Sequence, residues 1–217
     1  IPVLEMPTDY QRPILQSFEG ETISFKIDKE LTEKIKEIGK VNGTTEYMTL
    51  LSIYNILLSK YSGQEDIIVG SAIAGRPHAD LQKVVGMFVN TLAMRNYPNG
   101  EKKFKDFLQE VKKNALDAYE NENYQFDDLV EKVDIRRDLS RNAIFDTMFV
   151  LQNVEIKKLE IDSLSFKPYE IENKISKFDL TLSAIEVGEE IWFRLEYCTK
   201  LYKKETVERL IKHYKNI

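Results

Sequence analysis

The chain has 217 residues, enough for one large domain or for one lobe of a bigger one. Its formal net charge is -5, with acidic and basic residues interspersed, which excludes the dense basic surface typical of proteins that bind nucleic acids or membranes. No apolar run approaches the roughly 20 residues that span a bilayer, and Ile1 does not open a signal peptide, so we expect a cytoplasmic protein. Because residue 1 is not Met, we also expect a longer parent chain.

The first part of the sequence predicts a connector, a strand and two helices. Residues 1–20 hold three of the six prolines and show no periodicity, which is typical of an extended segment at a domain boundary. Residues 21–27 then alternate as a strand does, and Asp28 is placed to cap an amphipathic helix. Thr44 or Thr45 begins a second helix, which is apolar on most sides and is therefore expected to be buried.

The remainder predicts a sheet with further helices. The apolar runs at 65–75 and 87–95 read as interior strands covered on both faces. Helices are expected over 103–120, 126–133 and from Lys203 to the end, and strands over 143–153 and near 159–166, 178–187 and 190–197, the last two turning at Gly188. We therefore predict an α/β fold, a two-layer sandwich with a mixed β-sheet and helices packed on it.

The sequence contains no recognisable catalytic constellation. Its two histidines, His78 in a loop and His213 on the final helix, have no nucleophile or carboxylate pattern around them, and we interpret both as structural. The single cysteine, Cys198, forms neither a disulfide framework nor a CxxC metal pattern and is interpreted as a small buried hydrophobe. We therefore assign no catalytic residue and no metal ligand.

Two polar residues interrupt the apolar run at 87–95. Asn90 and Thr91 would cost about 1 to 3 kcal/mol each if they were buried without hydrogen-bond partners. Asn90 can bond to a neighbouring loop and fix the register of the strand, or it can line a polar tunnel. The residues alone leave both interpretations open.

The second polar feature is the stretch RDLSRN, which leads directly into an apolar strand. Arg137, Asp138 and Arg141 can form a paired network at the start of that strand, while Ser140 and Asn142 can bond to the backbone of the turn. This interpretation makes the stretch architectural, and the alternative is direct contact with a substrate.

Three blocks resemble, in order, the condensation domains of nonribosomal peptide synthetases. VGMFVNTLAMR at 85–95 resembles the fifth core motif of that family, and RDLSRNAIFDTMFVLQN at 137–153 resembles the seventh, with Ala143 where proline is usual. NENYQFDDLVE at 121–131 is similar to the sixth motif, HQDYPFE, in which the His, Asp and Pro are replaced here by Asn121, Asn123 and Gln125. The similarity covers nearly the whole chain.

The resemblance implies a two-lobed domain in which the catalytic motif and this chain belong to different lobes. The catalytic HHxxxDG motif of the family belongs to an N-terminal lobe and does not occur in this sequence. Residues 21–217 would then be a C-terminal lobe with a fold like chloramphenicol acetyltransferase, and residues 1–20 an inter-lobe connector. In the family, the phosphopantetheine arms of upstream and downstream peptidyl carrier proteins enter a tunnel between the lobes, where a peptide bond forms. No metal and no directly bound cofactor is implied.

The resemblance also suggests partners and roles. The expected partners are the missing N-terminal lobe, the two carrier proteins and an adenylation domain in cis. Asn90 would line the tunnel with Thr91 and Arg95 behind it, and RDLSRN would organise the lobe. We expect the chain alone to form no peptide bonds. The alternatives are an epimerisation or cyclisation lobe, a non-catalytic lobe that docks a carrier protein, and a coenzyme A acyltransferase.

Overall fold

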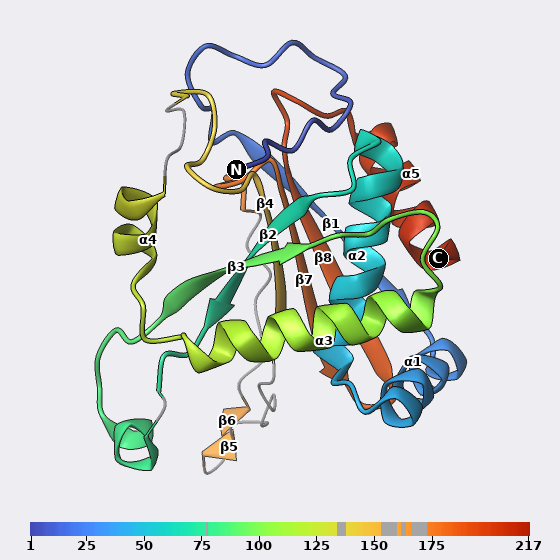
Figure 1. Ribbon diagram of the computed structural model, residues 1–217, viewed down its shortest axis with the longest axis vertical. Coiled ribbons are helices and arrows are strands. Elements are labelled where there is room, and N and C mark those ends of the chain that lie inside the picture. The colour runs from blue at the N-terminus through green and yellow to red at the C-terminus, as the bar shows by residue number, and fades with distance from the viewer. Residues whose placement is uncertain (77, 134–137, 153–159, 162–163, 166–172) are drawn as a thin grey trace.

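The computed structural model describes residues 1–76, 78–133, 138–152, 160–161, 164–165 and 173–217 (Figure 1). Its centre is a six-stranded mixed sheet with the strand order β1-β8-β7-β4-β2-β3. These strands are β1 (Gly20–Ile27), β2 (Ile67–Ile73), β3 (Asn90–Asn96), β4 (Thr147–Gln152), β7 (Leu180–Val187) and β8 (Glu190–Cys198). The helices are α1 (Lys29–Asn42), α2 (Glu46–Ser62), α3 (Phe104–Glu120), α4 (Phe126–Lys132) and α5 (Lys204–Asn216), with a short 3-10 helix, η1 (Ala79–Lys83). The predicted α/β sandwich is confirmed.

Strand pairing is parallel in the middle of the sheet and antiparallel toward both edges. β4 pairs in parallel with β2 and with β7, while β1 with β8, β7 with β8, and β2 with β3 are antiparallel pairs. β7 and β8 form the predicted hairpin, which turns at Gly188 with a φ of 66°, a left-handed conformation that favours glycine. The strand expected near 159–166 is present in its described part as a two-residue pair, β5 (Glu160–Ile161) with β6 (Leu164–Ser165).

The caps of the first two helices follow from local chemistry. The side chain of Asp28 accepts a hydrogen bond from the Leu31 backbone N–H at 2.9 Å, and the helix ends at Gly43 in a left-handed conformation. Thr45, rather than Thr44, caps α2, because its hydroxyl accepts from the Met48 N–H at 3.2 Å. Both helices begin where a short oxygen-bearing side chain can satisfy an otherwise free N–H.

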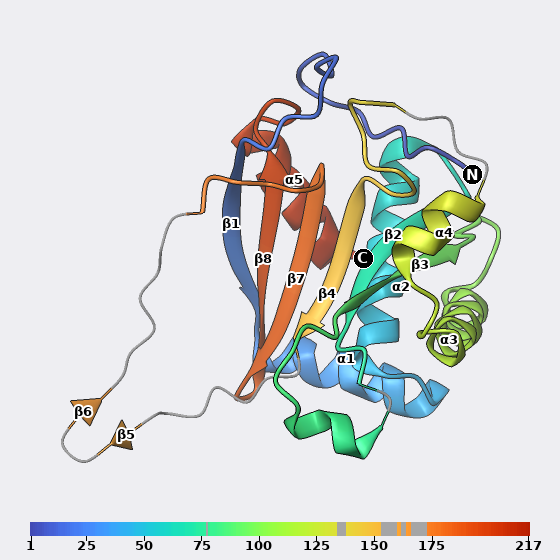
Figure 2. The ribbon, with the colours of Figure 1, turned by 90° about the vertical axis from the view of Figure 1, so that its left-hand side faces the viewer.

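The main core lies between the sheet and one layer of helices. α2 packs on β2 and β4, and α5 packs on β1 and β8. Figure 2 shows α1, α2 and α5 on one side of β1, β8, β7 and β4, with no helix of the described residues over their other face. The largest side chains that are almost fully buried are Tyr54, Tyr197, Tyr202, Phe149 and Phe193. One face of this part of the sheet is therefore apolar and covered, while the other is open.

A second, smaller core covers the opposite face around β2. Ile68, Ile144, Phe145 and Met148 are buried there, against partly buried apolar residues of α4. Gly70 makes this packing feasible, since a Cβ at that position would lie 2.1 Å from the Phe145 ring. β2 is thus covered on both faces, as its continuous apolar run predicted.

The prediction for the run at 87–95 was wrong in two respects. β3 starts at Asn90 and is the edge strand of the sheet, beside β2 (Figure 1). Met87 and Val89 precede it in a loop, with 93% and 59% of their surfaces exposed. Within β3 the burial alternates, and the less buried face is covered only in part, where Ala93 packs against the second core beside α4.

Candidate functional site

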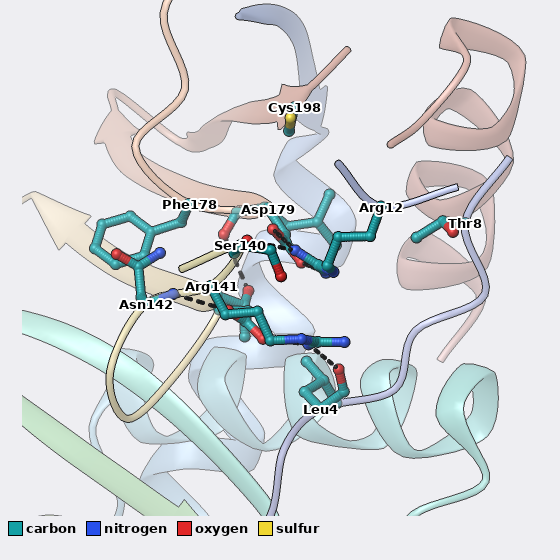
Figure 3. A network of polar contacts seen from close by, with 12 residues as sticks. Leu4, Thr8, Arg12, Ser140, Arg141, Asn142, Phe178, Asp179 and Cys198 are labelled. Atoms are coloured by element: carbon teal, nitrogen blue, oxygen red, sulfur yellow. Dashed lines mark hydrogen bonds and ion pairs between the residues drawn. The ribbon is translucent and has the colours of Figure 1, made fainter. Parts of the chain in front are cut away.

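The polar stretch after residue 137 forms a network with the N-terminal segment, at the end of the sheet where β4 and β7 begin (Figure 3). The guanidinium of Arg12 makes a bidentate pair with the carboxylate of Asp179, and its Nη1 also donates to the Ser140 carbonyl at 3.2 Å. Arg141 Nη1 donates to Asp146 Oδ2 at 2.6 Å and to the Leu4 carbonyl at 3.1 Å. Two arginines therefore fasten the N-terminal segment to the starts of two strands.

The register of the sheet brings the two carboxylates together. Asp146 precedes β4 and Asp179 precedes β7, and these strands pair in parallel with Thr147 opposite Leu180. The Asp179 N–H also donates to the Asp146 carbonyl at 2.9 Å. The same dipeptide, Phe-Asp, precedes both strands, and the rings of Phe145 and Phe178 stack 5.7 Å apart. Like charges placed this close need counter-cations, which Arg12 and Arg141 supply.

The turn that carries RDLSRN is closed by its own side chains. Asp138 Oδ1 accepts from the Ser140 N–H at 2.8 Å and from the Ser140 hydroxyl at 2.7 Å. Asn142 donates through Nδ2 to the Lys177 carbonyl at 3.3 Å, which links the turn to the segment before β7. Of the predicted motif, Arg137 lies outside the described residues, and Arg141 pairs with Asp146 rather than with Asp138.

The electrostatics of the network follow from burial and pairing. Burial raises the pKa of Asp146, the charge of Asp179 raises it further, and Arg141 acts in the opposite direction. Burial acts to lower the pKa of Arg12, but the hydrogen bond and charge of Asp179 outweigh it, so the pKa is raised. The Ser140 backbone and side chain hold the pKa of Asp138 below its ordinary value. Each buried carboxylate is matched by one arginine, which suits a structural network.

A cavity of about 690 Å³ lies beside this network. Its wall combines the N-terminal residues 1–5, both arginines and the loop from Asp138 to Asp146. A second hollow of about 630 Å³ lies on the open face of β1, β8 and β7, where outward side chains such as Thr22, Ser183 and Arg194 line it. The open sheet face is therefore hollowed, and polar and apolar side chains share its lining.

Asn90 is held by the segment between α3 and α4. Its side chain is buried, and Nδ2 donates to the carbonyls of Glu122 and Tyr124, both at 2.8 Å. Its Oδ1 accepts from the Phe126 N–H at 3.2 Å and from the Thr91 N–H at 2.9 Å. This saturated amide ties the start of β3 to the start of α4, which corresponds to the loop-bonding interpretation.

The other two residues assigned to the tunnel lie along the same strand. Thr91 is half-buried and pairs with Ala72 of β2. Arg95 forms a bidentate pair with Asp66, with Nε–Oδ1 at 2.8 Å and Nη2–Oδ2 at 2.7 Å, and is 45% exposed. Asn90, Thr91 and Arg95 therefore share a strand, but Arg95 is engaged by a surface carboxylate.

The histidines and the cysteine occupy unremarkable positions. His78 is 71% exposed and its Nδ1 accepts from the Asp80 N–H at 3.3 Å. His213 Nδ1 lies 2.8 Å from the Tyr61 hydroxyl on the outer side of α2 and α5. Cys198 is buried, and burial raises the pKa of its thiol. In the described part of the chain, no cluster of three or more His, Cys, Asp or Glu residues could hold a metal ion.

Sequence reasoning missed three members of the network: Arg12, Asp146 and Asp179. Arg12 was read only as part of an extended connector. The repeated Phe-Asp before β4 and β7 was the available signal, but its meaning depends on the two strands being parallel neighbours.

Among the helices that the structure describes, none has the length and apolar character of a membrane span.

A model of the condensation domain family matches the chain over residues 1–217. The chain belongs to the condensation domain family. Bacitracin synthase 3 of Bacillus licheniformis is 62% identical over 214 residues, which cover 99% of this chain and 3% of that protein. Gramicidin S synthase 2 of Brevibacillus brevis is 55% identical over 215 residues, covering 98% of this chain and 5% of that protein. The chain therefore spans a small part of these antibiotic synthetases.

Solved structures give the same fold. The four-domain nonribosomal peptide synthetase holo-AB3403, bound to AMP and glycine, matches 99% of this chain and 18% of its own length, with a TM-score of 0.91 and 21% identity. The first condensation domain of the calcium-dependent antibiotic synthetase, in complex with a substrate analogue, matches 95% of this chain and 45% of its own, with a TM-score of 0.76 and 15% identity. The fold is that of the condensation domains, which resembles chloramphenicol acetyltransferase, and the suspected family is confirmed.

Proposed function

We propose that this chain is the C-terminal lobe of a two-lobe condensation domain that forms peptide bonds in a nonribosomal peptide synthetase. One observation carries the proposal: the chain matches the family over all 217 residues, yet it corresponds to only 45% of the condensation domain of the calcium-dependent antibiotic synthetase. Residues 21–217 would be the lobe and residues 1–20 the connector from the other lobe. The family motif HHxxxDG does not occur in this sequence, which agrees with that division.

The proposed reaction joins two substrates that are tethered to carrier proteins. The amine of an aminoacyl thioester attacks the carbonyl of a donor acyl or peptidyl thioester. The C–N bond forms, the C–S bond breaks, the amine loses a proton, and the donor carrier keeps a free phosphopantetheine thiol. The rate gain comes mainly from holding the two tethered reactants together, with one polar contact from the histidine motif of the other lobe. An open half of the channel cannot supply that confinement, so the chain alone is proposed to be inactive.

Two groups of residues would serve this function in different ways. Asn90, with Thr91 and Arg95 behind it, would stand at the channel, because β3 is an edge strand whose start adjoins an exposed loop. The RDLSRN turn would be architectural, because Arg141 and Ser140 bond to the N-terminal segment and to neighbouring turns. By this division no residue of the described chain acts as a catalytic acid or base.

The proposed partners follow from the same chemistry. They are the N-terminal lobe, an upstream and a downstream peptidyl carrier protein, and an adenylation domain in the same synthetase. The chain would bind no cofactor of its own, since the phosphopantetheine arms belong to the carriers. We propose that it acts in the cytoplasm.

The experiment uses the two-lobe domain that contains this chain. A donor carrier and an acceptor carrier, each charged with an aminoacyl group, are mixed with the domain, and the acceptor carrier is analysed by mass spectrometry. We expect a dipeptidyl thioester on the acceptor, and none when the donor carrier is omitted. An epimerisation lobe would instead invert an aminoacyl group on a single carrier without joining two. That result, or no reaction at all, would refute the proposal.

A second candidate function follows from the lack of the family's histidine motif in this chain, and it needs a different measurement. The isolated chain could dock a carrier protein without performing chemistry. Isothermal calorimetry with an uncharged carrier protein would detect such docking as saturable heat. The absence of any heat with either carrier would remove this alternative.

A further inference from the structure

The segment between β2 and β3 is organised by one arginine. Gly75 follows β2 with a φ of 60°, and a Cβ at that position would lie 1.8 Å from the Phe88 carbonyl oxygen. Glycine is therefore needed both for the left-handed backbone and for the close approach of the two ends of the segment. This approach places Arg76 directly beside the backbone that leads into β3.

The Arg76 guanidinium contacts three carbonyls of that backbone and one ring. Nη1 donates to the carbonyl of Leu81 and, at 2.9 Å, to that of Val84. Nη2 donates to the Gly86 carbonyl at 3.3 Å. The guanidinium carbon lies 4.2 Å above the centre of the Phe88 ring. A planar group with several fixed donors suits such a set of carbonyls and a ring face, which an ammonium group cannot match.

The segment has little else to hold its shape. Neither of the two apolar clusters in the described chain contains a residue between Gly75 and Val89. Val85 and Met87 are 100% and 93% exposed, so their side chains contribute no core contacts. Apart from two backbone bonds, Leu81 N–H to the His78 carbonyl and Val84 N–H to the Leu81 carbonyl, the described contacts that hold residues 81–88 are those of Arg76 and the ring of Phe88.

This segment is continuous with the strand that carries the proposed channel residues. β3 begins at Asn90, two positions after Phe88. Asn90 is in turn fixed to the Glu122 and Tyr124 carbonyls. Only Val89 separates residues 84–88 from Asn90, so a displacement of this segment would bear directly on the start of β3.

We propose that Arg76 is a positioning residue for condensation: by bonding the carbonyls of Leu81, Val84 and Gly86 and stacking on Phe88, it holds the segment that sets the start of β3. Arg76 touches no substrate in this proposal and acts through the segment. The inference rests on the proposed function of the chain, since it assigns the start of β3 to the reaction channel.

The test compares three forms of the two-lobe domain: wild type, Arg76→Lys and Lys83→Ala. Arg76→Lys keeps the positive charge but loses the fork of donors, whereas Lys83→Ala removes an exposed cation from the same segment. For Arg76→Lys we expect hydrogen exchange of the Val84 amide, which bonds to the Leu81 carbonyl, to accelerate roughly tenfold, as a locally opened segment does. We expect kcat for dipeptidyl thioester formation to fall roughly tenfold through misplacement, with KM for the carriers nearly unchanged. The melting temperature of the Arg76→Lys domain should equal that of wild type. The Lys83→Ala domain should match wild type in exchange, kcat, KM and melting temperature.

Three other outcomes would each contradict one part of the proposal. If Arg76→Lys retains wild-type exchange and kcat, Arg76 is not a positioning residue. If its melting temperature falls in step with kcat, the residue is merely structural and the proposal is wrong. A wild-type domain that forms no product refutes the proposed function and, with it, the catalytic importance of Arg76. Amide exchange in the same samples still decides separately whether Arg76 holds the segment.

Discussion

Arg12 and Asp179, 167 positions apart in the sequence, form a bidentate ion pair in which Nη1 and Oδ1 are 3.0 Å apart. The pair connects a segment without regular secondary structure to Asp179, the residue immediately before β7. Its side chains are only 18% and 12% exposed, so water screens the charges weakly. A buried ion pair therefore fastens the N-terminal segment to the sheet.

Arg12→Ala should destabilise the chain by about 2 to 4 kcal/mol, because it leaves the Asp179 carboxylate buried without its cation. Urea denaturation would measure the change. Arg95→Ala is a matched control, since the Arg95–Asp66 pair is 45% and 33% exposed and should contribute less than about 1 kcal/mol. Equal losses from the two variants would contradict the structural role of the Arg12 pair.

Arg141→Ala should also lower stability, by about 3 kcal/mol at neutral pH, because Arg141 and Asp146 are 14% and 6% exposed. The variant additionally loses the bond to the Leu4 carbonyl. Thermal melting in neutral buffer would detect the loss. An unchanged melting temperature would show that the RDLSRN turn does not organise the lobe.

The pH dependence of that variant provides an independent check. The folded-state pKa of Asp146 is raised, so the folded chain binds the carboxyl proton more tightly than the unfolded chain does. The stability from this group is therefore lost as the pH rises from the unfolded-state pKa through the folded-state pKa. Arg141 lowers the pKa of Asp146, so its removal should raise that pKa further. The destabilisation by Arg141→Ala should therefore be smaller at about pH 4.5 than at about pH 7. Adding Asp146→Asn should abolish this difference, and a larger loss at the acidic pH would reverse the assigned sign.

Gly70→Ala should cost about 1 to 3 kcal/mol through overpacking, since the added Cβ would meet the Phe145 ring at 2.1 Å. Phe145→Leu in the same chain should recover part of the loss by vacating that space. Gly100→Ala is the control, because no atom lies within 4 Å of a Cβ there. Urea denaturation of the wild type, Gly70→Ala, Gly70→Ala with Phe145→Leu, and Gly100→Ala would rank their free energies of unfolding. A Gly70→Ala chain as stable as wild type would mean that the second core is more loosely packed than described.

Asn90→Ala, made in the two-lobe domain, should lower turnover roughly tenfold at a temperature where the variant remains folded. It should also cost about 1 to 3 kcal/mol, because the carbonyls of Glu122 and Tyr124 lose their donor. Steady-state rates and melting curves on the same preparation separate the two effects. A loss of stability with full turnover of the folded fraction would mark Asn90 as structural only.

Local signals predicted most elements of the fold. The oxygen-bearing caps Asp28 and Thr45, the apolar run of β2 and the turn at Gly188 each depend on neighbours within a few residues. The position of β3 at the edge could not be read in this way, because it depends on which strand becomes its neighbour. An apolar run looks the same in an interior strand and in a loop beside an edge strand.

The polar site was only half predictable for the same reason. The turn bonds between Asp138 and Ser140 are local, but the sequence predicted backbone bonds from Ser140 and Asn142 and an arginine partner for Asp138. Two partners of the arginines are not local: Arg12 bonds to Asp179, and Arg141 bonds to the backbone of residue 4. Asp146, in contrast, lies only five positions after Arg141. Asp179 lies beside Asp146 because β4 and β7 are parallel neighbours in one register.

The most direct test is product formation by this 217-residue chain without any other lobe. Donor and acceptor carrier proteins, both charged, are incubated with the chain and, in parallel, with the two-lobe domain at the same concentration. Mass spectrometry then compares each sample with a protein-free control. We predict a dipeptidyl thioester with the two-lobe domain and none above the control with the chain alone. Product from the chain alone would contradict the claim that this lobe forms only half of the reaction channel.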